Sequence, residues 1–297
     1  MRIGAVDIGT NSMKLLVADL AHGRLVEVAR EVHVTRLGHG LDTTGVLAEA
    51  AIERTVDILE RFGHLMNQAK VTRRRAVATS ASRDAANVHV FLDGAEAALG
   101  VRPEVVAGEE EARLAFAGAT LASEFERTLV IDLGGGSTEF VAGSSQPEYA
   151  SSVDIGSVRL TDRMPDRRPT RTNDVSHARA EVRAMFAELA LPAVDGVIGV
   201  AGTYTTLSAV RQELPEYDRQ AVHGSQLTLR DLDELVQQLC QLTIREISAI
   251  PSMDPRRAPV VVAGAIVAEE ALRASGHDVI TVSEMDILDG IALSFDA

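Results

Sequence analysis

The sequence predicts an α/β protein made of two related halves, and three observations support this. The chain has 297 residues, which is enough for two domains of ordinary size. Short β-type runs alternate with segments of helical hydrophobic spacing in both halves, as in α/β folds. The pattern Asp-x-Gly-x-x-Ser begins at Asp7 and again at Asp132, an offset of 132 − 7 = 125 residues. A repeat at this distance indicates two homologous domains rather than a solenoid.

The first half begins with a strand, a polar turn that contains glycine (residues 7–12) and a second strand. Further along, apolar residues at helical spacing alternate with short β-type runs, and Gly100 ends one of the helices. We expect strands at residues 3–6, 15–18, 76–78 and 105–106, and helices at residues 47–68, 88–99 and 109–122.

The second half repeats the opening pattern and continues in the same alternation. We expect strands at residues 129–131, 140–142, 197–200 and 279–282, and helices at residues 175–189, 229–242, 260–274 and 285–295. Residues 164–174, rich in proline and arginine, predict an exposed loop, and Gly202-Thr203 predicts a third turn of small residues. We place the domains at residues 1–122 and 123–297 and expect the terminal helix to pack back on the first domain.

Composition and charge exclude several classes of protein. The net charge of −14 argues against a protein that binds nucleic acid through bulk electrostatics. The single cysteine, Cys240, excludes a disulfide framework and a cysteine-based zinc site. Of the 29 basic residues only Lys14 and Lys70 are lysines, and neither lies in a P-loop or a Ser-x-x-Lys motif. No segment resembles a signal peptide or a membrane span, so we expect a cytoplasmic protein that does not bind membranes.

The two glycine-containing turns have the composition of phosphate-binding loops. Small residues let several backbone N–H groups approach one phosphate, and the side chains of Asn11, Ser12, Ser137 and Thr138 add polar groups. An aspartate at the strand end would repel a phosphate unless a cation or a water lay between them, which suggests a role for magnesium. A single such turn is more often a plain tight hairpin, but two matched copies favour phosphate binding.

Residues 7–12 and 130–139 resemble the two phosphate motifs of the actin/sugar-kinase/heat-shock-chaperone ATPase superfamily. More narrowly, the chain is similar to the exopolyphosphatase/guanosine-pentaphosphatase family, and to its short, two-domain actinobacterial type. Three further segments carry this resemblance, namely residues 79–87, 108–114 and 200–207. The resemblance implies two ribonuclease-H-like (actin-like ATPase) domains that face an inter-domain cleft.

The resemblance also implies roles for individual residues. In the family, the glutamate directly before an Ala-Arg pair activates the attacking water, and that position is Glu111 here. Magnesium is expected at Asp132 and Glu139. The expected substrate-binding residues are Gly9, Asn11, Ser12, Arg83, Gly135, Gly136, Ser137 and Arg159. Since the substrate is a polyanion and the net charge is −14, a basic segment is needed beside it, either residues 159–171 or residues 73–75. We expect residues 159–171, because they follow residues 152–157, which the family places beside the substrate path.

The expected reaction is release of terminal orthophosphate from inorganic polyphosphate by attack of water, with Glu111 as the general base. Two alternatives stay open: hydrolysis of guanosine pentaphosphate at its 5′ end, and a nucleotide-binding switch of the actin or chaperone type. The sequence is also compatible with a homodimer. A processive enzyme needs many contacts to a long polymer beyond its active site. Because no further domain is expected after Ala297 to enclose a binding channel, we expect distributive rather than processive hydrolysis.

Overall fold

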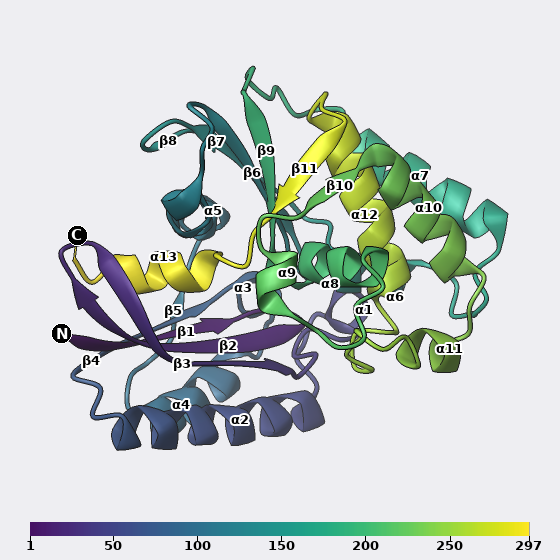
Figure 1. The fold of residues 1–297 in the computed structure, drawn as a ribbon. Coiled ribbons are helices and arrows are strands. Elements are labelled where there is room, and N and C mark those ends of the chain that lie inside the picture. Colours follow the sequence, from purple (N-terminus) through teal and green to yellow (C-terminus); the bar gives the residue numbers. More distant parts are fainter. Residues whose placement is uncertain (297) are drawn as a thin grey trace. The chain divides into compact units, whose positions relative to one another are not determined.

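The computed structural model describes residues 1–296, which form two compact units (Figure 1). Unit 1 comprises residues 1–118 together with the C-terminal residues from 285 onward, and unit 2 comprises residues 119–284. The chain therefore passes from one unit to the other twice. The first passage lies close to the domain boundary expected after residue 122, and the limits 1–122 and 123–297 stay a prediction.

The strands of unit 1 form a sheet in the order β3-β2-β1-β4-β5. β1, β2 and β3 are successive antiparallel neighbours, whereas β4 and β5 run parallel to β1. β1 and β2 are apolar and buried along most of their length, as expected for strands covered on both faces. The strands are β1 (Arg2–Ile8), β2 (Ser12–Ala21), β3 (Arg24–Val34), β4 (Arg73–Ala78) and β5 (Glu104–Val105).

Helices cover both faces of this sheet and form two apolar layers. α2 and α4 pack on one face, where Leu59, Phe62 and Phe91 are fully buried (Figure 1). α5 and α13 pack on the other face, where Leu114 and Ile291 are buried. The helices of unit 1 are α1 (Leu41–Thr44), α2 (Glu49–Gln68), α3 (Ser80–Asp84), α4 (Val88–Leu99), α5 (Gly108–Ala119) and α13 (Ile287–Leu293).

Two glycines let α5 and α13 contact each other through their backbones. A Cβ atom at Gly290 would lie 1.8 Å from the carbonyl oxygen of Leu114, and a Cβ atom at Gly118 would lie 1.9 Å from the carbonyl oxygen of Asp286. No side chain larger than hydrogen fits at either position. The position of α13 therefore determines the position of α5, the helix that begins with the acidic run at residues 109–111.

The sheet of unit 2 has the order β10-β11-β9-β6-β7-β8. β6, β7 and β8 are successive antiparallel neighbours, and β9 and β11 run parallel to β6, as β4 and β5 do to β1. β10 extends the sheet beyond β11 as an antiparallel edge strand. The strands are β6 (Thr128–Leu133), β7 (Thr138–Gly143), β8 (Pro147–Val153), β9 (Gly196–Val200), β10 (Gln226–Thr228) and β11 (Val279–Val282).

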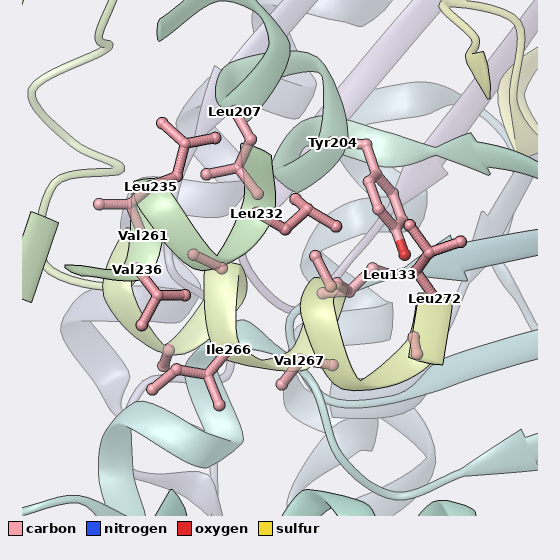
Figure 2. Close-up of a cluster of buried hydrophobic side chains, with 14 of the residues drawn as sticks. Leu133, Tyr204, Leu207, Leu232, Leu235, Val236, Val261, Ile266, Val267 and Leu272 are labelled. Carbon is pink, nitrogen blue, oxygen red and sulfur yellow. The ribbon is translucent and has the colours of Figure 1, made fainter. Parts of the chain in front are cut away.

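The core of unit 2 is built around the long apolar helix α12. Figure 2 shows its side chains between residues of α8, α10 and β6, and the labelled residues are Leu133, Tyr204, Leu207, Leu232, Leu235, Val236, Val261, Ile266, Val267 and Leu272. The helices of unit 2 are the 3₁₀ turn Thr120–Ala122, α6 (Ser157–Arg163), α7 (Thr172–Phe186), α8 (Ala201–Arg211), α9 (Arg219–Val222), α10 (Leu229–Cys240), α11 (Ile244–Ser248) and α12 (Val261–Ala274).

The α/β class and the duplication are thus confirmed, because both units share one strand order around a central parallel pair. The third turn predicted at Gly202-Thr203 is wrong, since these residues form the first turn of α8. Gly202 packs against Arg257, because a Cβ atom there would lie 1.9 Å from a guanidinium nitrogen of that side chain and would displace it. Within residues 1–296, none of the helices has the length and apolar character needed to cross a bilayer.

Candidate active site

The first glycine-containing turn connects β1 to β2 in unit 1. The amide of Gly9 donates to the carbonyl oxygen of Ser12 at 3.0 Å and closes the turn. The backbone N–H groups of Thr10 and Asn11 donate no hydrogen bond to any of the described residues. The carbonyl oxygen of Asn11 instead accepts bonds from the amides of Thr35 and Arg36, at 3.0 and 2.9 Å, which fixes the turn against the end of β3. The turn therefore presents backbone donors to a ligand.

The second turn, between β6 and β7 in unit 2, repeats this geometry. The amide of Gly134 donates to the carbonyl oxygen of Ser137 at 3.0 Å. The start of α6 binds the carbonyl groups of the turn: the amide of Arg159 donates to Gly135 at 3.1 Å, and its Nε donates to Gly136 at 2.9 Å. Among residues 1–296, no acceptor is bound by the N–H groups of Gly135 and Gly136. These two amides have the same role that we assign to the amides of the first turn.

Two buried carboxylates face each other beside the second turn. Asp132 on β6 and Glu139 on β7 are register partners, so their side chains lie on the same face of the sheet. Asp132 is 6% exposed and Glu139 is 1% exposed, and the hydroxyl of Ser152 on β8 donates to Glu139 Oε1 at 2.7 Å. Like charges at this spacing repel each other, so a cation between them would be stabilising.

Glu111 and Arg83 form an ion pair in unit 1. Glu111 lies in the first turn of α5 and is 7% exposed, and its Oε2 is 2.5 Å from Nη1 of Arg83 on α3. The same nitrogen of Arg83 donates to the carbonyl oxygen of Val106 at 3.0 Å. Burial raises the pKa of Glu111 above its ordinary value, whereas the nearby Arg83 opposes this rise and the charge of Asp7 adds to it. Unit 1 thus holds a carboxylate with the high basicity that a general base needs.

The three glutamates at residues 109–111 differ in burial and in their contacts. Glu109 is exposed, and Glu110 binds Arg113 through two hydrogen bonds of 2.8 Å. Arg113 lowers the pKa of Glu110, which makes it a weaker base than a free glutamate. Of the three glutamates, only Glu111 combines burial with a raised pKa.

Comparisons with known proteins identify the family of this chain. A model of the Ppx/GppA phosphatase family matches residues 16–295. The chain belongs to this family. It is 45% identical to a Mycobacterium tuberculosis protein named exopolyphosphatase 2, over 99% of this chain and 98% of that protein.

Solved structures of Ppx/GppA relatives share the fold. The structure of an Aquifex aeolicus Ppx/GppA family member has a TM-score of 0.83 at 32% identity, and the match covers 100% of this chain and 97% of that one. An exopolyphosphatase from Cytophaga hutchinsonii has a TM-score of 0.90 at 29% identity, with 99% of this chain and 97% of that one covered. Both matches extend over the whole chain rather than one half of it.

The structure of this Ppx/GppA chain adds residues that the motifs alone did not single out. The hydroxyl groups of Ser80 and Ser82 on α3 and of Thr35 after β3 are buried and have no hydrogen-bond partner within residues 1–296. Thr10 of the first turn connects to α3, because its Oγ1 accepts a bond from the amide of Ala81 at 3.2 Å. The sequence contained a signal for the serines, because both lie in the segment 79–87 that resembles the family.

Proposed function

We propose that this chain releases terminal orthophosphate from inorganic polyphosphate, with Glu111 as the general base for the attacking water. Membership of the family and the full-length similarity to a protein named exopolyphosphatase 2 support hydrolysis of a phosphoric anhydride. The observation that carries the assignment of the base is the buried position of Glu111, with its raised pKa, at the start of α5. A general base with a pKa nearer to neutral pH is both ionised and effective at neutral pH.

Arg83 and Glu111 cannot carry out their proposed roles while bound only to each other. The guanidinium group of Arg83 suits a phosphate, because its planar fork binds two oxygen atoms at once. We propose that a phosphate of the substrate attracts Arg83 and thereby weakens its hold on the carboxylate of Glu111. The carboxylate then becomes available to the water. Its pKa rises, because Arg83 opposes less strongly the increase in pKa that burial and the charge of Asp7 cause.

Each turn supplies hydrogen-bond donors for phosphate groups of the substrate. In our proposal, the amides around Gly9 and the side chains of Asn11 and Ser12 bind phosphate oxygen atoms in unit 1, and the amides of Gly135 and Gly136 and the side chain of Ser137 bind them in unit 2. Arg159, held against the carbonyl oxygen of Gly136, completes the substrate-binding set in unit 2. Phosphoryl transfer depends chiefly on positioning and charge stabilisation, so such fixed donors account for most of the expected catalysis.

Phosphatases of this family generally depend on a metal ion. We assign magnesium to Asp132 and Glu139, whose facing carboxylates match its preference for oxygen ligands. No group of three or more potential ligand side chains occurs within residues 1–296. This fits magnesium, which usually binds one or two carboxylates together with substrate phosphates and waters. When bound, the ion would neutralise charge on the phosphates, while Ser152 keeps the carboxylate of Glu139 in place.

The direct test is a phosphate-release assay with polyphosphate, guanosine pentaphosphate and ATP offered side by side in the presence of magnesium. We expect polyphosphate to be the preferred substrate. A preference for guanosine pentaphosphate would change the substrate that we assign but not the mechanism that we propose. Binding of ATP with little release of phosphate from any of the three would favour a nucleotide-dependent switch and contradict the proposal.

A further inference from the structure

The two glycine-containing hairpins differ in charge at one equivalent position. The offset of 125 residues that aligns Asp7 with Asp132 also aligns Lys14 with Glu139, because 14 + 125 = 139. In each hairpin the two aligned residues face each other across antiparallel strands: Asp7 faces Lys14, and Asp132 faces Glu139. The first hairpin therefore contains an ion pair where the second contains two carboxylates.

Lys14 bridges two carboxylates inside unit 1. It is 8% exposed, and its Nζ lies 3.2 Å from Oδ2 of Asp7 and 2.6 Å from Oδ2 of Asp286. Asp286 is also the N-cap of α13 and accepts a hydrogen bond from the amide of Leu288 at 3.0 Å. A single ammonium group thus joins the end of β1 to the start of α13, two segments almost 280 residues apart in sequence.

The use of lysine here is exceptional in this chain. Of 29 basic residues 27 are arginines, and the only other lysine, Lys70, is exposed. The compact ammonium group has three donors that can point to separate acceptors, whereas the planar guanidinium group of arginine needs a wider space. An arginine serves the neighbouring pair, where Arg30 donates to Asp289 at 2.5 Å. At position 14 a single ammonium group contacts both Asp7 and Asp286.

Two connections lead from Lys14 to Glu111. The first is mechanical, because α13 contacts α5 through the backbone at Gly290 and Leu114, and Glu111 lies one turn before Leu114. The second is electrostatic, because the charge of Asp7 raises the pKa of Glu111. The charged groups in this part of unit 1 are Asp7 on β1, Arg30 on β3, Arg83 on α3, Glu111 on α5, and Asp286 and Asp289 on α13.

We propose that Lys14 is a positioning residue, the built-in cation of the first hairpin, which fixes Asp7 and the start of α13 and so holds Glu111 in its working position. The inference rests on the proposed function of Glu111. It also assigns different means of charge balance to the duplicated hairpins: the first uses an ammonium group of the protein, and the second uses a bound metal ion. In the first hairpin burial raises the pKa of Asp7, and the charge of Lys14 opposes this rise.

The first test is kinetic and uses K14M, which keeps the length of the side chain and removes its charge. We expect kcat for polyphosphate to fall about 10- to 100-fold, the effect of a small displacement of a catalytic group. The KM and the half-saturating magnesium concentration should change by no more than about threefold, because Lys14 is buried away from both ligands in this proposal. An unchanged kcat in a folded K14M protein would overturn the proposal.

The matched control is D289N. Asp289 is 2% exposed, lies on the same helix and pairs with Arg30, and its Oδ2 also accepts a hydrogen bond from the amide of Asp286 at 3.1 Å. An asparagine can keep this bond through its amide oxygen while it loses the charge that pairs with Arg30, so D289N disrupts a comparably buried ion pair without removing a partner of Lys14. We expect D289N to lower the melting temperature but to leave kcat within about threefold of the wild type. An equal loss of kcat in D289N and K14M would mean that Lys14 only stabilises the fold. In a D7N background, K14M should lower kcat little further, and a full additional loss would contradict action through Asp7.

The second test does not depend on polyphosphate hydrolysis. K14E gives the first hairpin the charge pattern of the second, so it should bind one more Mn²⁺ per chain than the wild type. The bound ions are counted from the loss of the free Mn²⁺ signal in electron paramagnetic resonance, without substrate. If folded K14E binds the same number of Mn²⁺ ions as the wild type, Lys14 does not replace a bound cation and the proposal is overturned. If K14E does not fold, the kinetics of K14M and of K14M in the D7N background test the proposal instead. A wild type that hydrolyses no polyphosphate would refute the proposed function alone.

Discussion

Removing the guanidinium group of Arg83 should move the pH profile of this enzyme in a defined direction. A general base acts as a carboxylate, so the rate falls as the pH drops through the pKa of Glu111. In the free protein Arg83 holds this pKa down, against the effects of burial and of Asp7. In Arg83→Met the pKa of Glu111 must rise, so the acid limb of kcat/KM must move to higher pH.

The structure indicates a strong interaction between the two groups. The paired atoms of Arg83 and Glu111 are 2.5 Å apart, and the two side chains are only 20% and 9% exposed, so solvent screens the pair weakly. An opposite charge this close stabilises the ionised carboxyl group and lowers its pKa. We therefore expect the acid limb to move clearly to higher pH. The KM should rise as well, because Arg83 is also a proposed phosphate ligand.

The assay is orthophosphate release from polyphosphate between pH 5 and pH 9 at saturating magnesium. Arg75→Met is the matched control, because Arg75 is also 20% exposed but pairs with Glu104 and lies 3.6 Å from Glu110 instead of binding Glu111. Its acid limb should coincide with that of the wild type. An acid limb that stays in place in a folded Arg83→Met protein would refute the reasoning, since Glu111 would then not be the titrating base.

Three further predictions follow from the same geometry. Glu111→Gln should lower kcat about 10²- to 10⁴-fold in the same assay, because the amide cannot accept the proton of the water. Asp132→Ala and Glu139→Ala should each raise the magnesium concentration needed for half-maximal activity, whereas Arg159→Ala should raise KM only. Gly290→Ala should lower the free energy of unfolding in urea by about 1–3 kcal/mol, because its Cβ atom would lie 1.8 Å from a carbonyl oxygen of α5.

Each of these predictions has an outcome that contradicts it. If Glu111→Gln turns over within a few-fold of the wild type, Glu110 becomes the candidate for the base. If the magnesium titration is the same in both carboxylate variants, the metal lies elsewhere. If Gly290→Ala unfolds like the wild type, α5 and α13 can separate at little cost, and the mechanical connection between them is weak.

Within residues 1–296 the sequence analysis missed three strands, and β3, β8 and β10 all lie at sheet edges. β3 (Arg24–Val34) has valines at every second residue except position 30, but Val26, Val28 and Val32 are exposed, and its pairing with β2 shifts at an irregularity between Val17 and Ala18. β8 (Pro147–Val153) alternates in burial but consists mainly of small and polar residues. Continuous apolar runs identify the buried strands β1 and β6, whereas β3 and β8 contain no such run and depend on pairing with their neighbours.

The motifs identified the individual site residues, but they did not predict which of these residues contact each other. Arg83 and Glu111 are 28 residues apart, and their contact depends on how α3 and α5 are placed beside β4 and β5. The misassigned turn at Gly202 has a similar cause, because a Gly-Thr pair favours a turn locally while the structure continues into α8. Lys14 had a signal in the composition, as one of two lysines among 29 basic residues, but its partner Asp286 is 272 residues away.

A chain of net charge −14 that acts on a polyanion needs local positive charge, and the contacts of its arginines limit where that charge can come from. In the run at residues 73–75, Arg74 donates to the carbonyl oxygen of Leu99, and Arg75 binds Glu104. In the other basic segment, Arg163 pairs with Glu181 at 3.0 Å.

Guanidinium groups that already have carboxylate or carbonyl acceptors contribute little net attraction to a distant polyanion. Backbone N–H groups have no such competitor in the two glycine-containing turns, where the amides of Gly135 and Gly136 donate to none of residues 1–296. A metal ion at Asp132 and Glu139 would add a double positive charge at the same turn. In our proposal, attraction of the substrate therefore comes at short range from fixed backbone dipoles and a bound ion, together with Arg83 and Arg159, and it does not depend on the net charge of the chain.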